Sequence, residues 1–224
     1  MRSDLAKVVE TLAARHPAGA VLTDPLALIV WENVGYLVDD GRREALFAEF
    51  RDRIGLDAAA IVNAPPAVLL DIAERGGMNP PERARRLKAI GERIVELGGD
   101  LGSVITALPT TKARALLKGF PAVGDPLADK IMLFGGYEVR PALDSNGLRS
   151  LVRLGFCTER ASYSTTYRDA VTVMREHGRM ERDWLVGAWA ALREHGKILC
   201  RRKAPLCADC PLERECPKTE IRAL

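Results

Sequence analysis

Four cysteines near the end of the chain restrict its fold more than any other feature of the sequence. Cys200, Cys207, Cys210 and Cys216 are separated by six, two and five residues. Four thiolates in so short a loop suit a tetrahedral zinc ion or a cubane iron–sulfur cluster, although the spacing matches neither zinc ribbons nor the ferredoxin runs. In a reducing compartment such a set indicates a metal site before disulfides. We therefore expect this part of the chain to close around a metal group.

A helix, a tight hairpin and a second helix are expected to begin at Thr111. Apolar residues recur at helical spacing before Gly119, and Asp125-Pro126 supplies an N-cap and a first-turn proline for the second helix. The hairpin consists of Phe120, Pro121, Ala122, Val123 and Gly124. Successive backbone N–H groups of such a hairpin point outward beside a helix N-terminus, which suits an anion such as a DNA phosphate. The same residues also suit an ordinary interhelical turn.

The remaining segments also indicate helices, and no segment alternates as a strand does. Helices are expected over residues 3–16, 26–37, 44–53, 57–63, 66–74, 81–97, 101–107, 147–154, 167–177 and 182–195. The segment 26–37 is apolar nearly all round except at Glu32 and Asn33, so we place it in the middle of a domain. The sequence therefore predicts an all-α protein.

Composition limits the class of protein without fixing it. The 224 residues, 47% of them apolar, can form one large or two modest domains with a sizeable core. A net charge of +3 permits a nucleic-acid partner but does not require one. No apolar run is long enough to span a membrane, and the first residues read as an amphipathic helix and not as a signal peptide. We expect a soluble protein of the cytoplasm.

The segment from Ala191 to Cys200, followed by the cysteine spacing, resembles the C-terminal [4Fe–4S] loop of the endonuclease III group of DNA glycosylases. These enzymes form part of the helix-hairpin-helix superfamily, which has an invariant aspartate. The resemblance runs from about Leu22 to Cys216. It implies a helical barrel with the hairpin over residues 23–136, and a second domain made of residues 1–22 and 137–224 that carries the cluster. It also implies a nucleoid-associated monomer whose partner is double-stranded DNA with a flipped-out base.

Asp144 matches the aspartate of that family, and Asn146 lies where its adenine-excising members have asparagine. Cutting an N-glycosidic bond develops positive charge on the sugar, so the site needs a carboxylate and a nucleophile, which is water or a lysine amine. The base must also leave the stack to be reached. Asp144 is equally suited to cap the helix that starts near Ser145, and the two roles are compatible.

Two positions depart from the family pattern. Endonuclease III has its nucleophilic lysine two residues after the hairpin glycine, where this chain has Pro126, and it usually has glycine where this chain has Ala122. Alanine costs little there as long as its φ stays negative. Lys130 and Lys118 are expected to be solvated or to face phosphate. The prediction is a monofunctional glycosylase; the alternatives are a silent DNA-binding protein on the same scaffold and a bifunctional glycosylase/lyase with a relocated lysine.

The positions of several other residues in the sequence make them candidate site residues. Glu32 is a candidate catalytic carboxylate or the partner of an arginine, because a carboxylate on an apolar helix needs a partner or a raised pKa. Asn33 is expected to fill the gap left by the flipped base. Met78 falls near the family's intercalating wedge, although an exposed loop methionine is an equal interpretation. Arg201 and Arg202, within the cluster loop, are expected to meet phosphate or to form a solvated surface.

Overall fold

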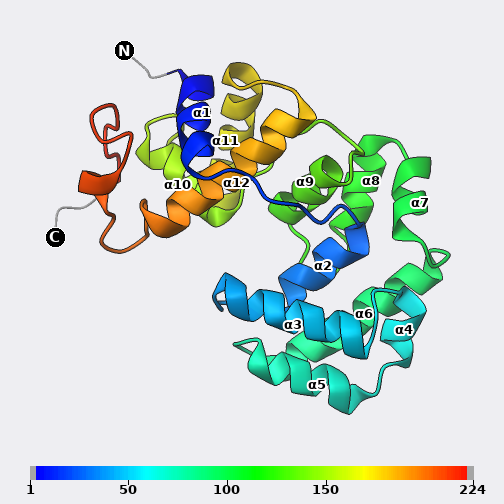
Figure 1. Cartoon of the computed structure of the whole chain (residues 1–224). Helices are drawn as coiled ribbons and strands as arrows, with labels where there is room; N and C mark the ends of the chain where they lie inside the picture. The colour runs from blue at the N-terminus through cyan, green and yellow to red at the C-terminus, as the bar shows by residue number, and fades with distance from the viewer. Residues whose placement is uncertain (1–3, 221–224) are drawn as a thin grey trace. The chain divides into compact units, whose positions relative to one another are not determined.

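The computed structural model describes residues 4–220, and helices joined by loops make up this range (Figure 1). Its helices are α1 (Leu5–Arg15), α2 (Pro25–Val34), α3 (Asp40–Arg53), α4 (Ala58–Asn63), α5 (Pro66–Arg75), α6 (Pro80–Glu96), α7 (Leu101–Ala107), α8 (Thr110–Leu117), α9 (Asp125–Phe134), α10 (Ser145–Arg153), α11 (Tyr163–His177), α12 (Arg182–Ile198) and the 3-10 turn η1 (Cys207–Asp209). Pairing of β type within this range is limited to an isolated bridge between Tyr36 and Gly77. The prediction of an all-α chain is confirmed.

Aspartate is the N-cap residue of six of the twelve α-helices within residues 4–220. In each case the carboxylate accepts a hydrogen bond from a backbone N–H of the first turn, which would otherwise lack a partner. The capping residues are Asp4, Asp24, Asp39, Asp57, Asp100 and Asp144. In α2, Pro25 at the first helical position also favours the helix start, because the N–H that proline lacks would have no partner within the helix there. Local capping chemistry therefore sets where many of the helices begin.

The first compact unit, here called the hairpin unit, consists of residues 22–124. Its central helix α6 packs against α4, α5 and α2, and α2 also packs against α3 and α7. Phe50, Ile72, Leu87 and Ile90 are fully buried in it. The glycine at 91 allows α4 to approach closely, because a Cβ there would lie 3.0 Å from the carbonyl oxygen of Ala58.

The second compact unit, here called the cysteine-loop unit, consists of residues 1–21 and 125–224. Helix α12 packs against α10, α1 and α9, and α11 contacts α10 and α1 (Figure 1). The segment that carries the cysteines follows α12 directly. Helix α9 falls in this unit, whereas the sequence analysis expected the domain boundary at Gly136, after this helix.

Several boundaries differ from the sequence prediction. Helix α2 ends at Val34 and not at Leu37, because Gly35 is extended and the Tyr36 N–H donates to the carbonyl oxygen of Gly76. Helix α11 begins at Tyr163, four residues earlier than expected, because the Ser162 hydroxyl caps it. In both places, interactions of the residues next to the helix end decide the boundary.

No helix within residues 4–220 has the length and apolarity needed to cross a membrane.

Candidate active site

Asp144 is the N-cap of α10, and its two carboxylate oxygens have different partners. Oδ1 accepts hydrogen bonds from the backbone N–H groups of Asn146 at 3.0 Å and Gly147 at 2.7 Å. Oδ2 accepts one from the side-chain Nδ2 of Asn146 at 3.0 Å. A quarter of the Asp144 side chain is exposed. The carboxylate is therefore held in a fixed orientation and still reaches solvent, so the capping role does not exclude a chemical one.

Asn146 is itself fixed by Arg149 on the same helix, α10, and by α12. Its Oδ1 accepts a hydrogen bond from Arg149 at 2.9 Å, which orients Nδ2 toward Asp144. Gly196 of α12 lies against it, because a Cβ at that position would stand 2.5 Å from the carbonyl oxygen of Asn146. Asp144 and Asn146, two of the three candidate catalytic residues, are therefore hydrogen-bonded to each other, whereas the third, Glu32, belongs to the hairpin unit.

The hairpin residues lie at the end of the hairpin unit. Phe120 and Val123 are buried, and the Val123 N–H donates to the carbonyl oxygen of Phe120 at 3.2 Å. Ala122 is exposed and has a φ of +60°. The condition of a negative φ, under which alanine would cost little, is therefore not met: this alanine occupies the left-handed region, where its Cβ crowds the following carbonyl oxygen. The turn has the conformation that glycine favours, without the glycine.

A groove of about 410 Å³ runs beside this hairpin, between α6 and residues Pro121 and Ala122. Arg85 and Arg86 line it, and both guanidinium groups pair with Glu82 on the same helix. Two arginines and one carboxylate leave the groove with net positive charge. No sequence pattern indicated this groove, because its two sides are distant in the sequence.

Glu32 and Asn33, neighbours on α2, make different contacts. Glu32 faces Arg43 at 3.4 Å, so the ion-pair interpretation of this carboxylate is present in the structure. Asn33 is buried, and its Nδ2 donates to the carbonyl oxygen of Ile29 at 2.9 Å. Its amide therefore satisfies the helix backbone instead of facing solvent, and a role of Asn33 in the gap left by a flipped base stays a prediction.

Met78 belongs to an exposed apolar cluster made by two loops of the hairpin unit. Tyr36, Leu37 and Met78 are 55%, 74% and 61% exposed, and the bridge between Tyr36 and Gly77 joins their loops. The buried Arg83 guanidinium fixes this arrangement by donating to the carbonyl oxygens of Val34, Ala73, Gly77 and Met78. Met78 was among the residues expected from the sequence, whereas Tyr36 and Leu37 were expected to be helical and were not.

Lys130 does not occupy the surface. Its side chain is 6% exposed, and its Nζ lies 4.5 Å from the ring centroid of Trp189 and 5.6 Å from that of Phe134. The expectation of a solvated or phosphate-facing charge is wrong, because aromatic faces attract the ammonium group into the packed interior of α9 and α12. Lys118, by contrast, is exposed at the end of α8.

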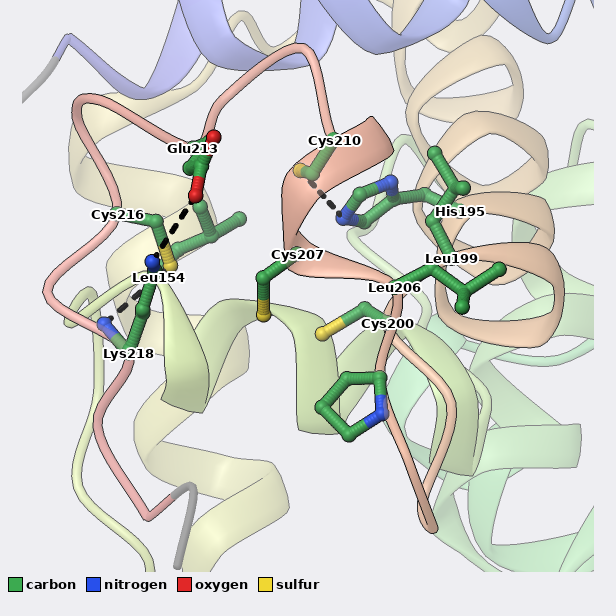
Figure 2. Close-up of a pocket in the computed structure, with 11 residues that line it drawn as sticks. Leu154, His195, Leu199, Cys200, Leu206, Cys207, Cys210, Glu213, Cys216 and Lys218 are labelled. Atoms are coloured by element: carbon green, nitrogen blue, oxygen red, sulfur yellow. Dashed lines mark hydrogen bonds and ion pairs between the residues drawn. The ribbon is translucent and has the colours of Figure 1, made fainter. Parts of the chain in front are cut away.

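The four cysteines of the C-terminal loop line one small cavity, of about 20 Å³ (Figure 2). Figure 2 shows the sulfurs of Cys200 and Cys207 turned toward each other and that of Cys210 turned toward His195, whose Nε2 lies 4.0 Å away. Within residues 4–220, no three His, Cys, Asp or Glu side chains are close enough together to hold a metal ion. The thiols share a cavity without forming a closed ligand shell.

The surroundings of these sulfurs fit a group held by four thiolates. The backbone N–H of Leu212 donates to the Cys210 sulfur, and that of Lys218 donates to the Cys216 sulfur, each at 3.4 Å. The Arg153 guanidinium lies 3.6 Å from the Cys200 sulfur. Hydrogen bonds and positive charge at sulfur are what stabilise ligand thiolates and tune an iron–sulfur cluster. The donor set and its surroundings are therefore compatible with such a group.

A second, larger cavity of about 780 Å³ adjoins the start of α10. Its charged lining is mostly basic, with Glu159 and Glu220 as the acidic residues and Arg149, Arg153, Arg160, Lys197, Arg201 and Arg202 as the basic ones. Arg201 and Arg202 are exposed, and their carbonyl oxygens accept hydrogen bonds from Arg153 at 2.7 and 3.1 Å. The cavity offers an anion several guanidinium groups close to Asn146.

No family model matches the sequence. Over 141 residues the chain is 28% identical to an endonuclease III of Treponema pallidum (strain Nichols), and the match covers 63% of this chain. The matched segment spans 60% of the length of that relative.

Solved structures of other proteins superpose on nearly the whole of this chain. A trapped endonuclease III–DNA covalent intermediate superposes with a TM-score of 0.75 at 17% identity, covering 94% of this chain and 92% of the other. A thermostable thymine-DNA glycosylase gives a TM-score of 0.72 at 18% identity, covering 96% and 95%. At such identities the likeness shows the fold, which is that of the endonuclease III-like glycosylases.

Proposed function

We propose that this chain, which has the endonuclease III-like glycosylase fold, is a monofunctional DNA glycosylase of base-excision repair. It would hydrolyse the N-glycosidic bond of a damaged or mismatched base, as a cytoplasmic monomer associated with the nucleoid. The observation that carries the proposal is the Asp144 carboxylate: it is fixed at the start of α10 by three hydrogen bonds and a quarter of its side chain still reaches solvent.

Asp144 would act on a nucleotide extruded from the duplex. As the base leaves, positive charge develops on the sugar, and a fixed carboxylate stabilises that charge without having to reorganise. The same carboxylate would orient the attacking water. Asn146 would hold Oδ2 of Asp144 in place through its side-chain hydrogen bond. Glu32 is the second carboxylate we assign to the catalytic group, with Arg43 as its partner before substrate binds.

Duplex DNA would meet several separate surfaces of the hairpin unit. The hairpin and the adjoining arginine-lined groove suit backbone phosphates, which fix register without reading sequence. The exposed Tyr36, Leu37 and Met78 suit the kinked base stack. In the cysteine-loop unit, the basic cavity with Arg201 and Arg202 suits further phosphates.

We also propose that Cys200, Cys207, Cys210 and Cys216 hold a [4Fe–4S] cluster. When bound, the cluster would tie residues 200–216 into one folded loop and would take no part in base release. The test is the Cys210→Ser variant, with Cys157→Ser as the control, because Cys157 does not line the cavity. Iron and acid-labile sulfide should fall in the first variant and stay at wild-type levels in the second. Equal iron in both variants would contradict the assignment.

The enzymatic proposal is tested with a panel of duplexes that carry uracil, thymine glycol, oxidised or alkylated bases, or mismatches, each incubated with and without alkali. Strand cleavage only after alkali supports a monofunctional glycosylase. Release of no base supports the silent DNA-binding alternative, which the strained Ala122 and Pro126 favour. Cleavage without alkali supports a lyase.

The role of Asp144 is tested on the substrate found. Asp144→Asn should remove base release, and Asp100→Asn should not, although both aspartates cap a helix with two backbone N–H partners. Asparagine is also a good N-cap, so both variants should fold. Equal rates in the two variants would refute the proposal.

A further inference from the structure

The positively charged side chain of Arg193 lies near the Oδ2 oxygen of Asp144. The Nε atom of Arg193, on α12, lies 3.5 Å from Oδ2 of Asp144. This separation is longer than an ordinary N–H···O hydrogen bond, so the interaction acts mainly through charge. The Arg193 side chain is only 18% exposed, and water therefore screens the pair less than it screens a surface ion pair.

The guanidinium group of Arg193 lies against an aromatic ring, and its Nη1 is also 3.6 Å from a carboxylate oxygen of Glu194. Trp189 lies one turn earlier on α12, and its ring centroid is 5.6 Å from the Arg193 guanidinium carbon. Trp189 is in turn packed edge-to-face against Phe134 at 5.1 Å and lies beside the Lys130 ammonium group. A guanidinium that rests on a fixed ring loses little further freedom when it faces a carboxylate.

The two sides of the carboxylate are thus supported differently. Backbone N–H groups of α10 fix Oδ1, whereas two side chains, Asn146 and Arg193, face Oδ2. Helices α10 and α12 pack against each other, so the position of Arg193 relative to Asp144 depends on the core of the cysteine-loop unit. The orientation of Oδ2 is therefore set from α12 as well as from α10.

We infer that Arg193 is a positioning residue for Asp144, an inference that rests on the proposed glycosylase function. Arg193 fixes the rotation of the carboxyl group and balances its negative charge until the cationic sugar takes over that partner. It acts through Asp144 and does not contact the DNA. Its loss leaves the carboxylate present but less well aimed, and misplacement by about 1 Å is known to cost up to about 100-fold in rate.

The test separates the rate of base release from DNA binding. Single-turnover rates at saturating enzyme and dissociation constants for the same lesion duplex are measured for Arg193→Gln, Arg193→Lys and the control Arg179→Gln, whose arginine pairs with Glu10. Arg193→Gln should release the base about 10-fold to 100-fold more slowly with unchanged DNA affinity. Arg193→Lys should recover part of the rate, because it keeps the positive charge. The control should match the wild type.

Three outcomes overturn the inference. They are an unchanged or faster rate in Arg193→Gln, a loss explained wholly by weaker DNA binding, and a loss in Arg193→Lys as large as in Arg193→Gln. Thermal unfolding of each variant shows whether it has folded. Asp144→Asn is included in the same series: if it keeps the wild-type rate, the proposed function fails, whereas if it alone loses the rate, only the role of Arg193 fails.

Discussion

Arg149 donates a hydrogen bond from Nε to the carbonyl oxygen of Cys200 at 3.0 Å, and so joins α10 to the first cysteine of the loop. The same guanidinium donates to the carbonyl oxygen of Gly196 at 2.6 Å and to Oδ1 of Asn146 at 2.9 Å. Burial lowers the pKa of Arg149, with the charge of Arg153 acting in the same direction. One partly buried side chain therefore supports both the residue that holds Asp144 and the start of the cysteine loop.

Arg149→Gln should destabilise the protein by about 2 to 3 kcal/mol in the free energy of unfolding, because three acceptors lose a charged donor. Urea titration measures this. Arg168→Gln is the control, since Arg168 is exposed on α11 and makes one long hydrogen bond to Thr165. A loss below about 0.5 kcal/mol, comparable with an ordinary surface substitution, would contradict the bridging role.

Ala122→Gly should stabilise the chain by about 1 kcal/mol. Alanine at a φ of +60° is strained, and glycine adopts this conformation without the steric cost. The control is Ala115→Gly, at an exposed position inside α8, where glycine should instead cost about 1 kcal/mol. Chemical denaturation of both variants tests the sign. Destabilisation of similar size in both would show that the turn does not strain the alanine.

The sequence predicted the features that depend on neighbouring residues. Asp24 and Asp144 cap the helices that the sequence places there, because capping needs only the next two or three backbone N–H groups. The all-α class followed from periodicity in the same way. Iron–sulfur ligation and the catalytic roles remain predictions.

Features that depend on distant partners could not be predicted. The burial of Lys130 depends on Trp189, and the position of Arg149 depends on the carbonyl oxygen of Cys200. A sequence pattern shows that a residue carries a charge. It does not show which aromatic ring or carbonyl group the charged side chain will contact. Ala122 was misjudged because its φ follows from how the hairpin joins two helices, and alanine gives no local sign of it.

Acid should weaken the hairpin unit through Glu49. Hydrogen bonds from Arg75 and then Arg53 lower the pKa of Glu49 from 4.5 to about 2. Because the folded pKa is depressed, this stabilisation is complete above pH 4.5 and is lost as the pH falls toward 2. The side chain is partly exposed, so its contribution is about 1 kcal/mol.

Glu49→Gln should therefore be less stable than the wild type near pH 7, and the two should converge as the pH falls from 4.5 to 2. Unfolding by urea across this range measures the difference. Glu74→Gln, an exposed change on α5, serves as the control and should leave the stability curve parallel to that of the wild type. A constant difference between Glu49→Gln and wild type at all pH values would contradict the linkage.

Pro126 should prevent the covalent chemistry that a lysine at this position would allow. It lies in the first turn of α9, directly after the hairpin, and carries no amine. Borohydride added to the wild type with its lesion duplex should trap no protein–DNA adduct, because the single lysine of α9, Lys130, is packed against Trp189. Pro126→Lys should form an adduct, because it places an amine at this position. The variant should fold, because a lysine is tolerated in the first turn of a helix. If the wild type forms an adduct that disappears in Lys130→Ala or Lys118→Ala, the monofunctional assignment is wrong and a relocated lysine performs the attack.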